Sequence, residues 1–547
     1  MFTYDATAYR QVFEREFTYL AGFRRNVHRY GGQTAIHDPV TEVRYTYAEL
    51  GARVDRLAAG LAAAGVQPGD VVTYQLYNGP EFAELYLATQ ACGAVGSPIN
   101  FRLAPGETAF ILDDSRPRVF VYDTELTEST SAALELATHR PELRVAVGAG
   151  NGLPGRRFEE LFVDAQPPVV SRDIYAETTR LYTSGTTGMP KGVPLNSMVE
   201  IFSAHDVIMH FPLTPEDRTL NMTPWFHRGG LYSGGPNPCF YLGSQVVPMR
   251  TFNAELCLDY VERFGLTFLI GAPTNLALLA RAQAARARDL SSLRGIVTMG
   301  APLEREAALR YQQVLTPRIF NGYGTTEGFW NTFLRPTDLP AHAGSAGRAC
   351  TDDDVRVVQL LDDRTAQPED TVAKDGGEVG EVIVRSPKCG YAYANSPQQE
   401  AARFHDGWLY IGDLATWDAA EFVTIVGRKD DMLISGGENI HPVQVEEALN
   451  QHPQITDCLV VGIPDERWGQ LVVAYVVRAN DALTAADCDE HCRNHPMLAP
   501  YKRPKAYRFV DELPVTATGK KIHYRATEQA TTDYAAGAFE AVGRSAE

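Results

Sequence analysis

The sequence predicts an α/β protein: a large N-terminal domain of layered α/β subdomains plus a β-rich subdomain, then a small α+β C-terminal domain. Between residues 46 and 301, short apolar runs alternate with segments of helical period, which is typical of parallel sheets covered by helices. Beyond residue 380, short strands bounded by turn residues follow one another, which indicates a β-rich unit. With 547 residues, the chain is also too long for a single hydrophobic core.

The elements of the first part follow in order. A helix is predicted over 46–65, because a capping box from Thr46 to Glu49 starts it, apolar residues then recur at helical spacing, and Gly65 ends it. A buried strand, a helix and a second strand follow. The same pattern predicts further strands of this type, so that the strand segments are 71–77, 97–100, 119–123, 143–149, 266–272 and 295–301, with the helix at 81–94.

The C-terminal part has a different sequence pattern, with short strands bounded by turns. Residues 380–387, 407–418 and 421–431 are predicted strands of the β-rich subdomain. A proline-started helix at 442–452 and strands at 457–465 and 470–479 form a small α+β unit of ordinary domain size. The predicted boundary lies at Asp430, which gives a large domain at 1–429 and a small one at 430–547.

Composition narrows the class of protein. The net charge of −18 argues against a nucleic-acid-binding surface, which needs clustered excess Lys and Arg. The eight cysteines are scattered without a zinc pattern, which favours a reducing compartment. The N-terminus lacks the apolar core of a signal peptide, and no apolar run is long enough to span a bilayer. The predicted location is the cytoplasm.

Two glycine- and threonine-rich segments are candidates for nucleotide binding. LYTSGTTGMPKG at 181–192 cannot form a packed helix, and its backbone N–H groups, hydroxyls and Lys191 suit an anion. Its composition alone fits a flexible surface turn equally well. In FNGYGTTEGF at 320–329, Tyr323 can lie against a flat heterocycle, Thr326 can bond a phosphate and Glu327 can hold Mg²⁺. A core tyrosine with a solvated glutamate is the alternative.

Six motifs occur in a fixed order along the chain: LYTSGTTGMPKG, TMGAPL (298–303), NGYGTTE (321–327), YIGD (410–413), GRKDDMLISGGENIHPVQVE (427–446) and PVTATGK (514–520). Together they resemble the adenylate-forming superfamily of acyl-CoA synthetases, peptide-synthetase adenylation domains and luciferases, over about residues 45–525. The resemblance is strongest to aryl- and acyl-CoA ligases of the 4-chlorobenzoate and benzoate type. The spacing of a P-loop kinase, G-x-x-x-x-G-K-[ST], is missing from the glycine loop.

The resemblance implies an ATP-dependent acid–CoA ligase that uses ATP, Mg²⁺ and coenzyme A. A carboxylic acid attacks the α-phosphate of ATP to give an acyl-adenylate and pyrophosphate, and the thiol of CoA then gives acyl-CoA and AMP. An enzyme that transfers the acyl group to a carrier-protein thiol or an amine is the alternative. A light-emitting oxygenase and a non-catalytic nucleotide-binding protein are more remote ones. A homodimer is expected by analogy.

The resemblance also implies which residues form the site, because each family motif can be matched to positions in this sequence. The residues that resemble its ATP and AMP contacts are Thr183, Ser184, Gly185, Thr186, Thr187, Gly188, Lys191, Gly300, Ala301, Pro302, Tyr323, Gly324, Thr325, Thr326, Glu327, Asp413 and Arg428. Glu327 is the implied magnesium ligand. Asp413 is the implied partner of the ribose hydroxyls.

The small domain supplies a catalytic lysine and a second active face. Lys520 matches the lysine of the first half-reaction when the motif is anchored on Gly519, whereas anchoring on Ile522 selects Lys521. The family's small domain rotates after adenylation, and Asp430 matches the hinge. The residues that resemble CoA contacts are Arg102, Gly436, Gly437, Glu438, Trp468, Tyr501, Arg503 and Lys505. The two glycines equally fit a tight turn, and YKRPK (501–505) equally fits a solvated loop.

The acyl group is expected at TPWFHRGG (223–230). His227 matches the family's aromatic gate beside the acyl carboxylate. Arg228 departs from the apolar residue usual there, and either contacts a polar substrate group or faces solvent. Ser197 stands where many relatives have a histidine. The stretch from Thr223 to Phe252 holds no acidic residue to pair with a substrate ammonium, which counts against amino acids.

Overall fold

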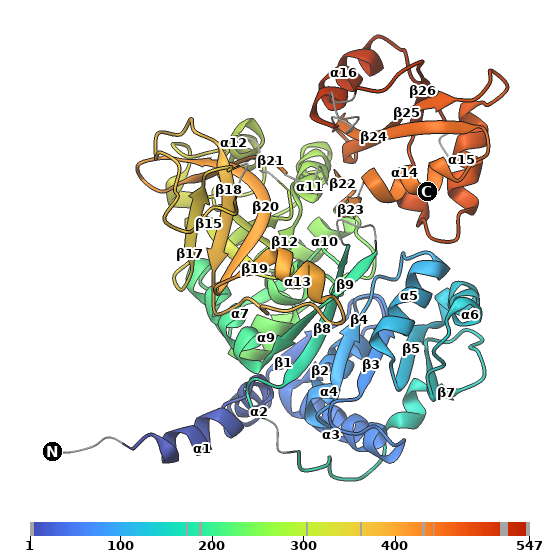
Figure 1. Cartoon of the computed structure of the whole chain (residues 1–547). Helices are drawn as coiled ribbons and strands as arrows, with labels where there is room; N and C mark the ends of the chain where they lie inside the picture. Colours follow the sequence, from blue (N-terminus) through green and yellow to red (C-terminus); the bar gives the residue numbers. More distant parts are fainter. Residues whose placement is uncertain are drawn as a thin grey trace.

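Two large sheets form the body of the protein, and a small domain lies beside them (Figure 1). The structure is a computed structural model. It describes residues 5–170, 173–184, 189–301, 303, 305–361, 364–428, 433–440, 442–514 and 523–542.

The first large sheet has seven strands in the order β7-β6-β5-β3-β4-β8-β9. Its central strands run parallel and are buried on both faces, as expected where helices cover both sides. Only the β8–β9 pair is antiparallel. The strands are β3 Val71–Gln75, β4 Val95–Pro98, β5 Val119–Asp123, β6 Leu143–Val147, β7 Arg156–Arg157, β8 Glu177–Ser184 and β9 Pro190–Asn196.

The second large sheet has nine strands in the order β16-β15-β14-β13-β12-β10-β11-β1-β2. A parallel centre is flanked by antiparallel strands at its two edges. Its strands are β1 Thr34–His37, β2 Arg44–Thr46, β10 Arg218–Asn221, β11 Gln245–Val246, β12 Phe268–Gly271, β13 Gly295–Met299, β14 Ile319–Thr325, β15 Phe329–Leu334 and β16 Arg348–Ala349. The predicted alternation of strands and helices is therefore confirmed.

Helices fill the space between the two sheets and cover their outer faces. One of them, α7, contacts β9 of the first sheet and β15 of the second. The predicted capping box is present at the start of α3. The helices of this region are α1 Thr7–Glu16, α2 Tyr19–Arg29, α3 Tyr47–Ala63, α4 Pro80–Ala91, α5 Pro105–Ser115, α6 Thr127–Leu136, α7 Ser197–His210, α8 Arg228–Tyr232, α9 Pro236–Leu242, α10 Ala254–Phe264, α11 Pro273–Ala285 and α12 Arg305–Val314.

The β-rich subdomain is a five-stranded antiparallel sheet. Its elements are β17 Asp354–Val358, β18 Gly380–Arg385, α13 Pro397–Arg403, β19 Phe404–His405, β20 Trp408–Trp417 and β21 Val423–Arg428. The subdomain begins earlier than the predicted residue 380, because β17 pairs with β18 across a long polar loop that separates them in the sequence.

The small domain packs helices on both faces of a four-stranded sheet. Along β24, Val460 faces the cluster that includes α14 and α15, while Leu459 and Val461 face the cluster that includes α16. This alternation is the two-residue period of a strand. The elements are β22 Leu433–Ser435, β23 Glu438–Ile440, α14 Pro442–Asn450, β24 Ile455–Asp465, β25 Gly469–Arg478, α15 Ala485–Asn494, β26 Ala506–Phe509, α16 His523–Ala535 and β27 Glu540–Ala541.

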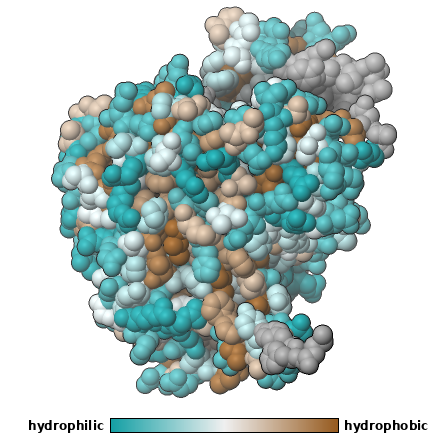
Figure 2. Space-filling model, turned by 90° about the vertical axis from the view of Figure 1, so that its left-hand side faces the viewer, coloured by the Kyte–Doolittle hydropathy of each residue, from teal (hydrophilic) through white to brown (hydrophobic). Residues whose placement is uncertain are grey.

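The face beside the N-terminus is largely hydrophilic, with smaller hydrophobic areas between the polar side chains (Figure 2). Helix α1 projects from the body in Figure 1 and exposes Tyr9, Val12 and Phe13. Among the described residues, no helix has both the length and the apolar character needed to cross a membrane.

Candidate active site

The predicted nucleotide end of the site lies where two parallel strands of the nine-stranded sheet end. Met299 of β13 lies opposite Gly322 of β14, so that Gly300 and Tyr323 follow at the same edge. Gly300 has a φ of +82°, which favours glycine, and a Cβ there would meet no heavy atom within 4 Å. Gly300 therefore leaves open space at the edge of the sheet where Tyr323 also lies. This edge is where ligands of α/β proteins usually bind.

Asp413 reaches this edge from the five-stranded sheet. The hydroxyl of Tyr323 donates a hydrogen bond to Asp413 Oδ2 at 2.7 Å, and Asp413 is buried. Arg428 lies opposite Asp413 in the β20–β21 pair. The structure thus brings Tyr323 against Asp413, 90 positions further along the sequence, and places the backbone of Arg428 opposite Asp413.

The glycine-hydroxyl segment joins β8 and β9. Thr183 lies opposite Lys191, and Ser184 lies opposite Pro190. The predicted loop is therefore shorter than its twelve residues, because its ends continue an antiparallel pair. Lys191 is buried, and its ammonium lies 5.1 Å from the centre of the Tyr393 ring. Gly185, Thr186, Thr187 and Gly188 lie outside the described residues.

The Thr326–Glu327 turn connects β14 to β15. Gly324 is needed at its start, since a Cβ there would lie 1.4 Å from Phe329 O. Thr325 Oγ1 accepts a hydrogen bond from Gly328 N–H at 3.2 Å and closes the turn. Thr326, which is expected to contact the phosphate, is half-buried.

Tyr393 is a site residue that the sequence did not reveal. Its hydroxyl donates to Glu327 Oε1 at 2.5 Å, while its ring faces Lys191. Burial and the nearby carboxylate of Glu327 raise the pKa of Tyr393, so that the hydroxyl remains a donor at neutral pH. Tyr393 therefore connects the implied magnesium ligand to the lysine of the phosphate segment.

Arg228 is buried, which corrects the alternative that it faces solvent. Its guanidinium donates hydrogen bonds to Thr326 O at 2.7 Å, Lys388 O at 2.8 Å and Ser203 Oγ at 3.2 Å. The physical reason is its position at the start of α8, which points into the protein behind the Thr326–Glu327 turn.

At the acyl end, the small domain reaches into the large one. His227 precedes α8, and its Nε2 lies 3.5 Å from Glu438 Oε2 of β23. Arg102 donates to Glu438 Oε1 at 2.8 Å, and Asn100 donates to Oε2 at 3.3 Å. Burial raises the pKa of Glu438, but hydrogen bonds and positive charge from His227 and Arg102 outweigh it and lower the pKa.

The predicted CoA segment SGGEN forms the tight β22–β23 hairpin. Gly436 and Gly437 have φ values of +60° and +79°, and the N–H of Gly436 donates to Trp468 O at 2.7 Å. A Cβ on Gly436 would lie 3.0 Å from the Trp468 ring. Both glycines are thus explained by the turn that presents Glu438 to His227.

The residues of the YKRPK segment mainly contact other residues of the protein. The guanidinium of Arg503 is buried against Asp489 at 2.7 Å, which favours a structural role over the implied contact with a CoA phosphate. Tyr501 and Lys505 are half-buried, and the Lys505 N–H donates to Val472 O. Lys502, which sequence reasoning passed over, is buried and reaches across the domain junction to Glu107.

Besides Gly185, Thr186, Thr187 and Gly188, four further residues on which the prediction depends lie outside the described ranges: Pro302, Asp430, Lys520 and Lys521. Only the backbone of Ser184 and Arg428 is described. Their roles remain predictions.

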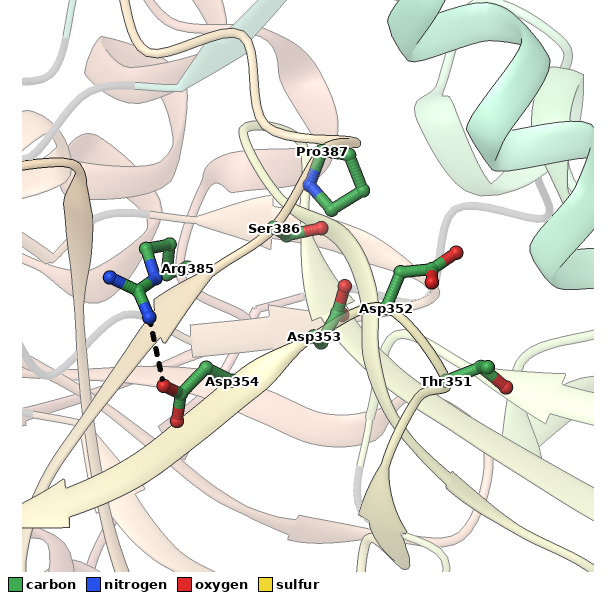
Figure 3. Close-up of a pocket in the computed structure, with 7 residues that line it drawn as sticks. All are labelled: Thr351, Asp352, Asp353, Asp354, Arg385, Ser386 and Pro387. Carbon is green, nitrogen blue, oxygen red and sulfur yellow. Dashed lines mark hydrogen bonds and ion pairs between the residues drawn. The ribbon is translucent and has the colours of Figure 1, made fainter. Parts of the chain in front are cut away.

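A shallow hollow of about 320 Å³ lies beside the five-stranded sheet, lined by Thr351, Asp352, Asp353, Asp354, Arg385, Ser386 and Pro387 (Figure 3). Arg385 pairs with Asp354, and the buried ammonium of Lys388 lies 3.0 Å from Asp353 and 2.9 Å from Asp206. Asp206, His210 and Cys350 have ligand atoms close enough together for a metal ion. Because Lys388 already neutralises Asp206, the arrangement favours a structural ion pair there.

The sequence matches the family described as "AMP-binding enzyme" over residues 23–393, and its C-terminal domain over residues 444–520. A feruloyl-CoA synthase from Amycolatopsis is 36% identical over 477 residues, which cover 87% of this chain and 92% of that protein. An indoleacetate–CoA ligase from Aromatoleum aromaticum is 34% identical, with coverage of 89% and 93%. The solved structure of the amide bond synthetase McbA from Marinactinospora thermotolerans is 26% identical, with a TM-score of 0.83 and coverage of 94% and 99%.

The fold and the site therefore define an adenylate-forming enzyme. This chain belongs to the AMP-binding enzyme family, as the six motifs predict.

Proposed function

We propose that the protein is an ATP-dependent acid–CoA ligase. It joins a carboxylic acid to AMP with release of pyrophosphate, and then transfers the acyl group to the thiol of CoA. The observation that carries the proposal is the convergence at one place of Tyr323–Asp413, the Thr326–Glu327 turn and His227 with Glu438. These are a nucleotide end, a phosphate end and an acyl end.

The first half-reaction brings a carboxylate against an anionic phosphate, so that positive charge is needed to reduce the repulsion. Lys191 supplies one charge beside the phosphate segment, and Lys520 is proposed to supply another near the reacting atoms. Asp413 and Tyr323 hold the nucleoside, and Thr326 bonds the α-phosphate. Proton transfer is not required of His227 in this step, because the attacking group is already an anion.

Glu327 fits the proposed role of magnesium ligand. Its carboxylate is half-buried and bonded to the neutral hydroxyl of Tyr393, and carboxylate oxygens are the ligands that Mg²⁺ prefers. Bound there, Mg²⁺ would offset phosphate charge. What this chain contributes is the fixed position of Glu327 between Tyr393 and the backbone of Gly390, whose N–H donates to Glu327 O at 3.2 Å.

The second half-reaction is supported by the position of the β22–β23 hairpin. Glu438 lies against His227 and Arg102, so that the small domain presents this face to the acyl end. The thiol attacks the acyl carbonyl, and AMP leaves with the electron pair of the broken bond. The proposed domain boundary at Asp430 and the rotation about it would exchange Lys520 for this hairpin between the two steps.

The test is a screen of carboxylic acids for pyrophosphate release, with and without CoA. Acids with aromatic rings come first, because relatives are named for feruloyl and indoleacetate groups. The expected result is acid-dependent release of pyrophosphate and formation of AMP, followed by thioester when CoA is present. If no acid gives AMP, the proposal is rejected.

Transfer to an amine is a second candidate, favoured by the likeness to an amide bond synthetase. One activated acid offered in parallel to free CoA, a holo carrier protein and a set of amines separates the acceptors. Thioester with free CoA at a higher kcat/KM than amide or carrier product supports the acid–CoA ligase. We expect the protein to act in the cytoplasm and to form a homodimer, which size-exclusion chromatography with light scattering would test.

A further inference from the structure

Arg228 lies between the acyl end and the phosphate end of the site. It directly follows His227 in the chain, and only 3% of it is exposed. Among the described residues, every hydrogen-bond acceptor of its guanidinium is a carbonyl or hydroxyl oxygen, and none is a carboxylate. A buried arginine without a carboxylate partner is unusual, since burying a charge is costly unless it is paired. This cost suggests that the contacts of Arg228 with these carbonyl and hydroxyl oxygens serve the site.

The guanidinium lies against two aromatic rings on one side. It lies 5.2 Å from the centre of the Tyr232 ring and 5.5 Å from that of Phe329. Aromatic contacts of this kind stabilise a cation and restrict its orientation. The rings belong to α8 and β15, the elements that flank the acyl segment and the Thr326–Glu327 turn.

On one side, the guanidinium is tied to a rigid anchor. The carbonyl of Lys388 accepts its hydrogen bond, and the ammonium of the same residue is buried between Asp206 and Asp353. A residue held at both its carbonyl and its ammonium cannot shift without breaking buried ion pairs. Lys388 therefore provides a fixed reference point.

On the other side, the guanidinium holds the turn. Its Nη1 donates to Thr326 O at 2.7 Å and lies 3.4 Å from Glu327 O. The two carbonyls are thereby directed towards Arg228 and away from the opposite face of the turn.

We propose that Arg228 is a positioning residue that sets the Thr326–Glu327 turn for the α-phosphate and couples it to the acyl segment at His227. The inference rests on the proposed function, in which this turn contacts the phosphate. The planar fork of arginine bonds several acceptors at once, whereas lysine offers one compact ammonium. Loss of the fork should therefore leave the turn in place but less well aligned.

The test compares binding of AMP and of adenosine by calorimetry in wild type, Arg228→Lys and Arg228→Met. The two ligands differ only in the phosphate that the turn is proposed to contact. In both variants we expect AMP to bind about tenfold more weakly, because a charge-assisted contact is misaligned. Adenosine binding should stay within about twofold, since Tyr323 and Asp413 are unchanged.

Kinetics give a second readout. For Arg228→Lys, kcat of acid-dependent pyrophosphate release should fall by about 10- to 100-fold, the scale expected for misplacement of about 1 Å. The KM for ATP should change by less than the fall in kcat. A loss of folded protein alone would lower the apparent activity and leave both the KM and the AMP-to-adenosine ratio unaltered.

Arg288→Lys is the matched control. Arg288 is also buried and donates to two carbonyls, Ala282 O at 3.0 Å and Arg286 O at 2.7 Å, on and just after α11. Unlike Arg228, it also pairs with two carboxylates, Glu255 and Asp259 of α10, all remote from the Thr326–Glu327 turn. We expect a comparable loss of thermal stability and an unchanged AMP-to-adenosine ratio.

The possible outcomes distinguish a failure of the proposed function from a failure of the positioning role of Arg228. If the wild type does not prefer AMP to adenosine, the proposed function fails. If the wild type prefers AMP and both Arg228 variants keep that preference with normal kcat, the positioning role is overturned and the proposed function stands. Parallel loss of AMP and adenosine binding in the Arg228 variants would also overturn it, because that pattern indicates general unfolding of the site.

Discussion

Lys520 is the residue of the small domain on which the first half-reaction is predicted to depend. We expect Lys520→Ala to lose adenylation by about 100-fold or more, because a fixed ammonium beside the developing charge is removed. Thioester formation from supplied acyl-adenylate should be retained, since that step uses the other face of the small domain. Pyrophosphate exchange and thioester formation, assayed separately, measure the two steps.

Lys521→Ala is the control for that substitution. Its adenylation should stay close to that of the wild type. If Lys521→Ala loses adenylation and Lys520→Ala does not, the motif must be anchored on Ile522. Equal loss of both half-reactions in Lys520→Ala would contradict the division of labour between the two domain positions.

The buried carboxyl of Glu84 is predicted to make the stability of the protein depend on pH. It is buried on α4 with the guanidinium of Arg53 as its partner, and burial raises its pKa to about 7 despite the hydrogen bond from Arg53. Because the folded pKa lies above the unfolded value of about 4.3, the stabilisation is present at low pH and is lost as pH rises through 7. The expected loss between pH 5 and 8 is roughly 3 kcal/mol at most.

Glu84→Gln removes this titration and keeps the shape of the side chain. Urea unfolding at pH 5 and pH 8 should show that wild type loses stability relative to the variant as pH rises. Parallel pH dependence of the two proteins would show that Glu84 does not titrate in this range.

For some single residues, the sequence predicts the chemistry of the side chain but not its contact partner. The motif identified Glu327, but its partner Tyr393 lies 66 positions away, so no local spacing could indicate the contact. Arg503 looked like a phosphate ligand by residue type, whereas its burial against Asp489 explains its charge within the small domain. Residue type predicts what a side chain can do, and the fold decides which partner it meets.

At the scale of elements, the β22–β23 hairpin is predicted to serve the second half-reaction. Glu438→Gln keeps the shape of the side chain but weakens its attraction to Arg102 and His227. We expect thioester formation to fall by about tenfold, as for a buried charge pair that is broken, while adenylation changes by less than about threefold. Single-turnover assays of each half-reaction provide the measurement.

Glu466→Gln is the matched control for Glu438→Gln. Glu466 also pairs across the two domains, with Arg281, but its side chain is 87% exposed. Exposed pairs contribute little, so we expect neither half-reaction to change. Similar losses in both variants would indicate that domain charge in general, and not the hairpin, limits the second step.

Elements with a strong local pattern were predicted well. The helix at 46–65 is α3, and the helix at 442–452 is α14, each with its predicted start to within a residue. The start of the β-rich subdomain and the continuation of β8 and β9 into the phosphate segment were not predicted. Both depend on pairing with a distant or antiparallel partner, and pairing leaves little trace in a single strand's sequence.

At the scale of the whole molecule, Gly106 lies at the contact between the two domains. It lies in the first turn of α5, and its N–H donates to Pro496 O of the small domain at 3.0 Å. A Cβ there would lie 2.3 Å from Met497 Sδ and 2.5 Å from Pro496 O. Gly106→Ala should therefore disfavour the docked arrangement, while alanine suits the helix itself by roughly 0.5 kcal/mol.

The expected result for Gly106→Ala is slower thioester formation with normal adenylation. The control is Gly51→Ala, a helical glycine in α3 whose close neighbour, Val27, belongs to the large domain. If Gly106→Ala slows adenylation and spares thioester formation, the arrangement described here belongs to the first step instead.

The sequence by itself determined the class of this protein. The strand–helix alternation predicts layered α/β sheets because burial imposes a period on each element, and six motifs in order predict adenylate chemistry because phosphate and ribose need particular residue types. Only the tertiary structure decided that Arg228 lies behind the Thr326–Glu327 turn, that Tyr393 holds Glu327, and that Glu438 reaches His227 from the other domain. Those contacts join segments far apart in the chain, and their existence depends on how whole sheets and domains pack.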